Sequence, residues 1–277
     1  MKKVIIQGDD LGYNSFCNDG IFFAYENGIL TSTTVLANLL NDTEKKYYND
    51  RLSNLINKSG LKKPRLGIGI HLNVTFGQPL SNNWPQKQFA RPFKGTGKPE
   101  EWQGSAWTKY CSQFTEKQVE DEYRLQIEKG LDFFGDYIDH LDSHHYTASY
   151  QPLKDIYEQL AKEYNLAVRA EAPLSEIPVY GGDFKFSKDS SQLLHQKNIK
   201  TADDYVLKLF FNEKNPVKSM LQYLSNLPEP TTEFMFHPAK GKDADKWRQI
   251  DLSLLINPEI ISFFNNNSVT LINYKGL

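Results

Sequence analysis

The chain has 277 residues, a length that one α/β barrel commonly fills, so we expect a single domain over residues 1–277. Its 32 Lys and Arg residues nearly balance 34 Asp and Glu residues, and this offers no electrostatic basis for binding nucleic acid or an anionic membrane. Two cysteines exclude a disulfide framework. No run approaches the roughly 18 apolar residues of a membrane span, or a secretory signal, so we expect a cytoplasmic protein with a small or neutral partner.

Short β-branched runs alternate with longer amphipathic segments, which is typical of βα units. After a first extended run at residues 4–6, a helix is expected to open at Asn18-Asp19-Gly20 and to close at Gly28. A second extended run at residues 31–36 completes one βαβ unit.

Further helices have recognisable starts. Thr115 and Gln118 form a predicted capping box, Pro152 suits a first helical turn, and Asn215-Pro216 begins another helix. Residues 265–267 predict a turn into a last strand at residues 269–272. Six or seven strand candidates with interleaved helices favour a (β/α) barrel, incomplete or distorted, over an open sheet with a nucleotide crevice.

Two stretches do not fit this rhythm. Residues 81–113 are polar yet hold Trp84, Trp102 and Trp107, and a loop of this length is often a lid or a binding loop. Residues 181–200 are expected to form a second excursion or a short hairpin.

Polar side chains gather where the short apolar runs end. The ends of parallel strands meet at one edge of a sheet, so these residues are expected to share one site. They are Asp9, Asp10, His71, the segment 139–145, Arg169, Glu171 and His237. Successive side chains point to opposite faces of a strand, so Asp9 and Asp10 are expected to have different tasks, one binding a cation and one handling protons, unless the pair is only a turn.

The segment 139–145 places three imidazoles and two carboxylates together, and a shared divalent ion would offset the cost of crowding them. One Asp and two His suit zinc and also accommodate manganese, cobalt or magnesium, with open positions for water and substrate. His71 and His237 each have the alternative of being satisfied by neighbouring groups. The spacing does not distinguish His144 from His145 as a ligand. Neither a P-loop nor a Gly-x-Ser-x-Gly elbow is present.

Five motifs in consistent order resemble those of the YdjC-like carbohydrate deacetylases, a family that includes the chitooligosaccharide deacetylases. The motifs are Gly8-Asp9-Asp10-Leu11-Gly12, residues 27–34, Gly69-Ile70-His71-Leu72, residues 140–145 and Phe236-His237-Pro238. The resemblance implies a (β/α) barrel related to polysaccharide deacetylases and a metal-dependent hydrolase of sugar N-acetyl groups. The family usually has Phe at Leu11 and often His at Tyr146, differences that bear on pocket shape.

The resemblance also implies roles for individual residues. Asp10, His71 and His144 match the ligands of one divalent metal ion, magnesium or zinc, while Asp9 matches a general base and His237 a general acid. Arg169 is expected either to pair with Asp9 near the substrate or to form a structural salt bridge. Trp102 and Trp107 are expected to stack on a sugar or to anchor the insertion.

The implied substrate is a small acetylated amino sugar or chito-oligosaccharide, and the sequence leaves open its phosphorylation, the metal and whether subunits form a homodimer. Two alternatives stay open: a metallohydrolase of another amide or a phosphate ester, and a non-catalytic sugar-binding or regulatory barrel.

Overall fold

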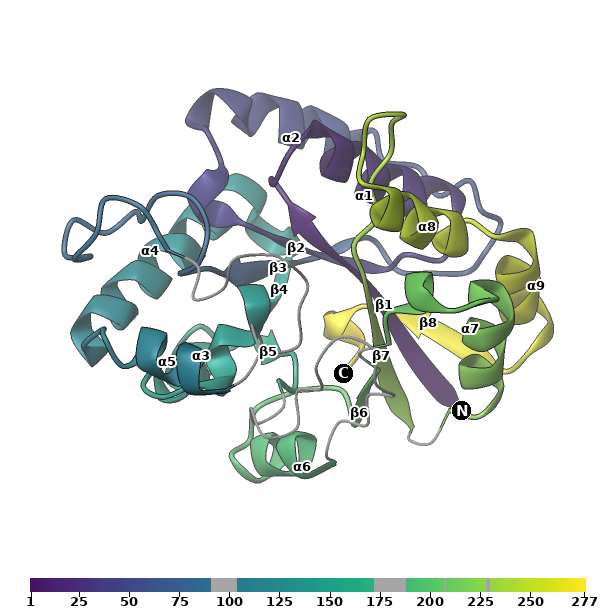
Figure 1. Ribbon diagram of the computed structural model, residues 1–277. Helices are drawn as coiled ribbons and strands as arrows, with labels where there is room; N and C mark the ends of the chain where they lie inside the picture. Colours follow the sequence, from purple (N-terminus) through teal and green to yellow (C-terminus); the bar gives the residue numbers. More distant parts are fainter. Residues whose placement is uncertain (91–103, 172–187, 207, 228–229) are drawn as a thin grey trace.

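The computed structural model describes residues 1–90, 104–171, 188–206, 208–227 and 230–277 (Figure 1). Its sheet is parallel throughout and places β1 at the centre, in the order β5-β4-β3-β2-β1-β7-β6, with β8 also paired to β1. The strands are β1 (Lys2–Leu11), β2 (Ser32–Val35), β3 (Gly67–Leu72), β4 (Ile138–Ser143), β5 (Ala167–Val168), β6 (Asp204–Val206), β7 (Thr231–Phe236) and β8 (Val269–Ile272). Within the described ranges no ladder joins β5 to β6, so the predicted incomplete (β/α) barrel is confirmed.

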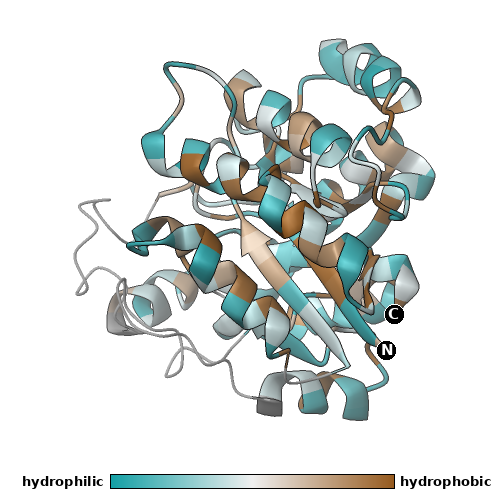
Figure 2. Ribbon diagram, turned by 90° about the vertical axis from the view of Figure 1, so that its right-hand side faces the viewer, coloured by the Kyte–Doolittle hydropathy of each residue, from teal (hydrophilic) through white to brown (hydrophobic). Residues whose placement is uncertain are grey.

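Helices follow most strands and cover the outside of the sheet (Figure 1). They are α1 (Ser15–Asn27), α2 (Lys45–Ser53), α3 (Gly104–Cys111), α4 (Glu116–Phe134), α5 (Leu153–Glu163), α6 (Lys188–Gln196), α7 (Pro216–Ser225), α8 (Lys246–Leu255) and α9 (Pro258–Asn266). Figure 2 shows hydrophilic and hydrophobic residues side by side along these helices, as expected when one face packs on a sheet. Among the described helices, none combines the length and the apolar character needed to cross a bilayer.

The predicted helix signals are largely confirmed. Thr115 accepts a hydrogen bond from the Gln118 backbone N–H, and the Gln118 side chain accepts one from the Thr115 N–H, so the capping box opens α4. Val119, Tyr123 and Ile127 are then fully buried along one face, as the 3.6-residue period predicts. Asn215 caps α7, which has its proline in the first turn.

Three boundaries differ from the prediction. Helix α1 begins at Ser15, because Asn14 rather than Asn18 caps it by accepting from the Cys17 N–H. Asn18 instead lies within the helix, where its side-chain oxygen accepts from the Gly12 N–H. Pro152 is the residue before α5, and the helix α9 continues to Asn266, so the turn before β8 is shorter than expected.

The two irregular stretches contain helices. Residues 81–113 include α3, so the expected long loop is wrong for this part, and 181–200 contains α6 where a hairpin was one expectation. Trp84 is buried and packs on Phe89 and Phe114. Trp102 lies outside the described residues, as do residues 181–187.

The glycines of β3 make room for the next strand. A Cβ at Gly67 would lie 2.3 Å from a carboxylate oxygen of Asp139, and one at Gly69 would lie 2.3 Å from the ring of His140. Both neighbours belong to β4, so these glycines let buried polar side chains of β4 lie against β3.

Candidate active site

A bulge in β1 turns both aspartates toward the same end of the sheet. Gly8 pairs with Thr33 of β2 and Leu11 with Val35, so Asp9 and Asp10 together face Thr34 alone. Asp10 takes a left-handed backbone with φ of 76°. The expectation that these carboxylates point to opposite faces is therefore wrong, because it assumed a regular strand. Each still has its own set of partners.

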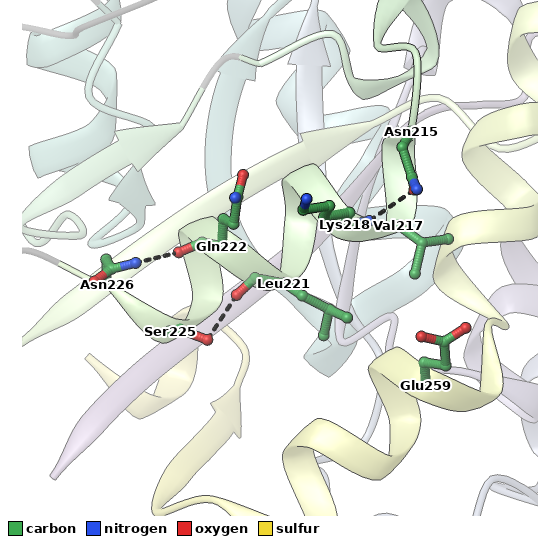
Figure 3. Close-up of a pocket in the computed structure, with 8 residues that line it drawn as sticks. All are labelled: Asn215, Val217, Lys218, Leu221, Gln222, Ser225, Asn226 and Glu259. Atoms are coloured by element: carbon green, nitrogen blue, oxygen red, sulfur yellow. Dashed lines mark hydrogen bonds between the residues drawn. The ribbon is translucent and has the colours of Figure 1, made fainter.

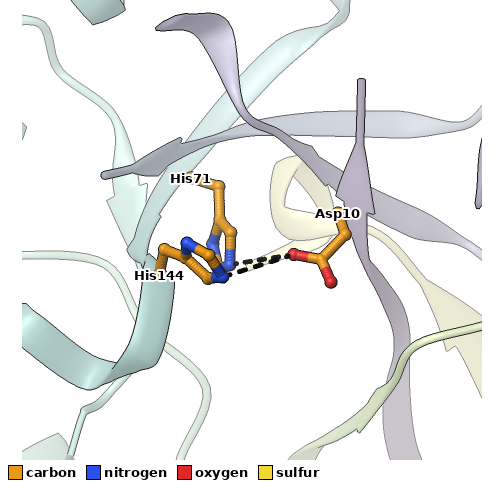
Figure 4. A group of neighbouring side chains, drawn as sticks. All are labelled: Asp10, His71 and His144. Carbon is orange, nitrogen blue, oxygen red and sulfur yellow. Dashed lines mark ion pairs between the residues drawn. The ribbon is translucent and has the colours of Figure 1, made fainter. Parts of the chain in front are cut away.

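Asp10, His71 and His144 converge from the ends of β1, β3 and β4 (Figure 4). Asp10 Oδ1 lies 3.6 Å from His71 Nε2 and 4.0 Å from His144 Nε2. Oδ1 is buried and has no hydrogen-bond partner among the described residues. A buried carboxylate oxygen is normally satisfied, and one carboxylate with two imidazoles is a common donor set for a divalent cation. The residues present therefore fit such an ion.

Arg248 holds the other oxygen of Asp10. Arg248 lies on α8, and its guanidinium donates a hydrogen bond of 2.6 Å to Asp10 Oδ2. The ring of Trp247 lies against the same guanidinium. Burial alone would raise the pKa of the Asp10 carboxyl, but Arg248 and the surrounding histidines hold that pKa well below its ordinary value. Asp10 is therefore charged at neutral pH and available to a cation.

His71 is oriented by Asp142. The Nδ1 of His71 lies 2.8 Å from Asp142 Oδ1, which also accepts from the Thr34 hydroxyl. This leaves Nε2 facing Asp10, the carboxylate–imidazole arrangement that commonly orients metal-binding histidines. Burial opposes protonation of His71, yet the charge and hydrogen bond of Asp142 raise its pKa to about 9 without a cation present.

His144 and His145 differ in direction. His144 begins the 3-10 helix η5 (His144–Ser149) and faces Asp10 through Nε2, with Asn73 Oδ1 3.3 Å from its Nδ1. His145 stacks on it at 3.8 Å and its Nδ1 lies 2.9 Å from the Thr75 hydroxyl. Burial and the neighbouring His145 lower the pKa of His144 well below its ordinary value, which favours the neutral, ligating form.

Arg169, after β5, pairs with Asp9 as expected. Its two terminal nitrogens donate to the two Asp9 oxygens at 2.8 and 2.9 Å. The same guanidinium lies 2.8 Å from both Asp142 and Glu233, and it is only 1 % exposed. These contacts favour a role in orienting carboxylates over direct contact with a substrate.

His237 follows β7 at the edge of the site. Its Nε2 lies 4.0 Å from Asp9 Oδ2, its ring meets Trp247 edge-on at 5.4 Å, and its backbone N–H donates to Asp251. Burial lowers the pKa of His237 to about 4, so its imidazole is neutral at pH 7. A general acid must carry a proton, so the role expected of His237 requires that it first receive a proton from another group.

Trp107 lies beside the histidines but is enclosed. Its ring stacks on Tyr150 at 5.7 Å, lies 6.0 Å from His145, and is 1 % exposed. This burial is what the anchoring interpretation expects of Trp107.

Several contributors to the site had no assigned role in the sequence. Asp142 belongs to the polar segment 139–145. Because it lies two residues after His140 on a strand, the sequence could have placed it on the same face as His140. Arg248 and Glu233 had no such signal, because the first lies on a helix and the second precedes an apolar run instead of following one.

A separate groove of about 580 Å³ lies between α7 and α9 (Figure 3). Leu221 and Gln222 line it from α7, and Glu259 lines it from α9. None of the site residues described above contributes to this groove.

Comparison with known proteins places the chain in a family. The family description "YdjC-like protein" matches residues 3–266. The chain is 28 % identical to a carbohydrate deacetylase of Thermoanaerobacter pseudethanolicus, covering 100 % of both chains, and 29 % identical to one of Clostridium beijerinckii, covering 99 % of this chain and 100 % of that relative.

Among solved structures, a "putative cellobiose-phosphate cleavage protein" of Enterococcus faecalis V583 superposes with a TM-score of 0.69 at 20 % identity. The match covers 99 % of this chain and 98 % of the other. At that identity the likeness supports the fold. The chain belongs to the YdjC-like protein family.

Proposed function

We propose that this protein is a metal-dependent deacetylase that hydrolyses the N-acetyl group of a small acetylated amino sugar or chito-oligosaccharide. Relatives named carbohydrate deacetylases that align over the whole chain support the reaction class. The observation that carries the proposal is the buried, unpartnered Oδ1 of Asp10, which faces the Nε2 atoms of His71 and His144.

Asp10, His71 and His144 would hold the cation. A divalent ion there lowers the pKa of water and polarises a carbonyl oxygen, which is the chemistry that amide hydrolysis needs. Two neighbours hold two of these ligands in place. Arg248 is hydrogen-bonded to Oδ2 of Asp10, and Asp142 to Nδ1 of His71, so the Oδ1 of Asp10 and the Nε2 of His71 are left to face the cation. Magnesium and zinc both remain candidates for the ion.

Asp9 is the proposed general base. It takes a proton from the attacking water while Arg169 keeps both of its oxygens oriented. The new carbon–oxygen bond forms at the acetyl carbonyl, and the carbon–nitrogen bond then breaks.

His237 is the proposed proton donor to the departing sugar nitrogen. Because it is neutral at pH 7, we assign it a relay role in which it receives the proton from Asp9, 4.0 Å away, before passing it on. The second proton of the water leaves with acetic acid, and the sugar leaves as the free amine.

The deciding experiment is acetate release from N-acetylated chito-oligosaccharides, with and without phosphate, after chelation and after adding back single metals. Asp10→Asn removes the charge of one ligand, and asparagine tolerates the left-handed backbone. We expect its activity to fall on the order of 100-fold or more. Asp50→Asn, at an exposed acid paired with Lys46, is the matched control and should keep full activity.

The outcomes separate the alternatives. Hydrolysis of phosphate esters without acetate release would favour a different bond, and sugar binding measured by calorimetry without any turnover would favour a binding protein. Release unaffected by chelation would contradict the metal requirement.

A further inference from the structure

The mechanism above leaves one buried acid without a task. Glu233 lies in β7 and is fully buried, and its Oε1 accepts a hydrogen bond from Arg169 Nε at 2.8 Å. Its Oε2 accepts from the hydroxyl of Tyr274, which is three positions before the last residue, Leu277. Glu233 therefore links the C-terminal segment to the arginine that holds the proposed base.

The three contacts of Arg169 fix its plane. Nη1 and Nη2 grip Asp9, Nη1 also lies 2.8 Å from Asp142 Oδ2, and Nε faces Glu233. A guanidinium is planar, so a partner at Nε determines how the other two nitrogens are presented. Without Glu233, the Nε of Arg169 would lose its partner, and only the contacts of the two terminal nitrogens would still orient the guanidinium.

Tyr274 is itself fixed in place. It is 2 % exposed, begins the 3-10 helix η8 (Tyr274–Gly276), and its ring stacks on His140 at 3.8 Å with planes 9° apart. His140 is in turn held by Asp139 at 2.7 Å and Gln7 at 3.1 Å. The hydroxyl of Tyr274 therefore reaches Glu233 from a rigid support.

A purely structural ion pair between Arg169 and Asp9 would not require Glu233 and Tyr274. Asp9 and Asp142 already pair with the single charge of Arg169, and a further buried carboxylate is costly. Burial raises the pKa of Glu233, and the arginine and the tyrosine hydroxyl oppose that rise by stabilising its charged form. An arrangement that carries this cost is more readily explained by the orientation it imposes.

We propose that Glu233 and Tyr274 are positioning residues that orient Asp9 through Arg169. The C-terminal segment then contributes to the proposed active site through the hydroxyl of Tyr274. The proposal rests on the deacetylation proposed above. It predicts that removing either residue lowers kcat while leaving KM almost unchanged, since both side chains are buried and closed to a substrate that enters from solvent.

The test uses three variants of the full chain and one control. Tyr274→Phe deletes the hydroxyl and keeps the ring on His140, and we expect a fall in kcat of about 3- to 10-fold. Glu233→Gln should cost about 10- to 100-fold in kcat. The double variant should be no slower than Glu233→Gln, because both changes act through one chain of contacts. Tyr25→Phe removes another buried tyrosine hydrogen bond, to the Pro64 carbonyl, and should leave kcat unchanged.

Crystal structures of the variants give a readout independent of turnover. Rotation of Arg169 away from the two-point grip on Asp9 in Glu233→Gln supports the proposal, even if the wild type proves inactive on every sugar tested. Retention of that grip together with wild-type kcat in both single variants would overturn it. The proposal would also be overturned if the fold losses of kcat in the two single variants multiplied in the double variant. A loss in Tyr25→Phe as large as the losses in Tyr274→Phe and Glu233→Gln would have the same consequence.

Discussion

Asp10 combines a strained backbone with a side chain that faces two imidazoles. A left-handed backbone is uncommon outside glycine, and aspartate and asparagine are among the side chains that tolerate it best. Here it follows from the bulge in β1, which aims Oδ1 at two imidazoles and Oδ2 at Arg248. Such strained residues gather at functional sites, where the surrounding structure holds them in place.

His237 offers a prediction about pH. Its pKa is lowered to about 4 by burial, so a histidine that must arrive protonated would lose activity tenfold per unit from pH 5 to 7. A relay that starts neutral instead gains activity as pH rises through about 4 and keeps it to pH 7. We expect the second profile for kcat, measured with saturating metal.

Metal content, measured at each pH, controls for loss of the ion. His237→Ala should lower kcat on the order of 10²- to 10⁴-fold at pH 7. A steady decline of wild-type kcat from pH 5 upward would instead identify a resting imidazolium.

At the scale of elements, α1 packs closely against the segment that carries His237. A Cβ added at Gly20 would lie 2.5 Å from Ala239 Cα and 2.6 Å from the Pro238 carbonyl oxygen. Because both atoms are backbone, Gly20→Ala must displace this segment. We expect at least a 10-fold loss of kcat together with a lower melting temperature.

Asp19→Ala changes the neighbouring exposed residue of the same helix and is the control, with activity expected to stay within twofold of wild type. A fully active Gly20→Ala enzyme would show that the contact does not position His237.

The capping box at the start of α4 is expected to contribute to the stability of the fold and not to the activity. Thr115→Ala removes the acceptor for the Gln118 N–H at the start of a helix that contributes none of the proposed metal ligands. We expect a loss of about 1 kcal/mol in the free energy of unfolding, measured in urea, and no change in kcat. Thr43→Ala, at an exposed threonine of the 3-10 helix η2 (Asp42–Glu44), is the comparison.

At the scale of the whole molecule, the proposed cation joins three strands that are distant in sequence. Binding to the native state alone at 100 times Kd adds about 2.7 kcal/mol to stability. For a chain of this size we expect a rise in melting temperature of about 5 °C or more on adding the native metal, reversed by chelation. Asp10→Asn should show almost no rise; an equal rise in that variant would place the ion elsewhere.

Part of the fold was predictable because its signals are local. The Thr115 capping box, the cap at Asn215 and the closure of α1 at Gly28 each depend on a few neighbouring residues. Alternating apolar runs likewise predicted an incomplete parallel barrel. The start of α1 at Asn14 was missed by four residues, since several polar residues nearby could cap equally well, whereas Pro152 lies within one residue of its predicted place.

The sequence by itself identified the carboxylates and imidazoles that stand at strand ends, because each of them follows a short apolar run. Tertiary structure alone decided their geometry. The bulge that aims Asp9 and Asp10 to one side depends on the register between β1 and β2. The partners Arg248, Glu233 and Tyr274 come from distant elements, and burial shifts the pKa of His237. Distances and desolvation arise only when the chain is packed, so no local pattern encodes them.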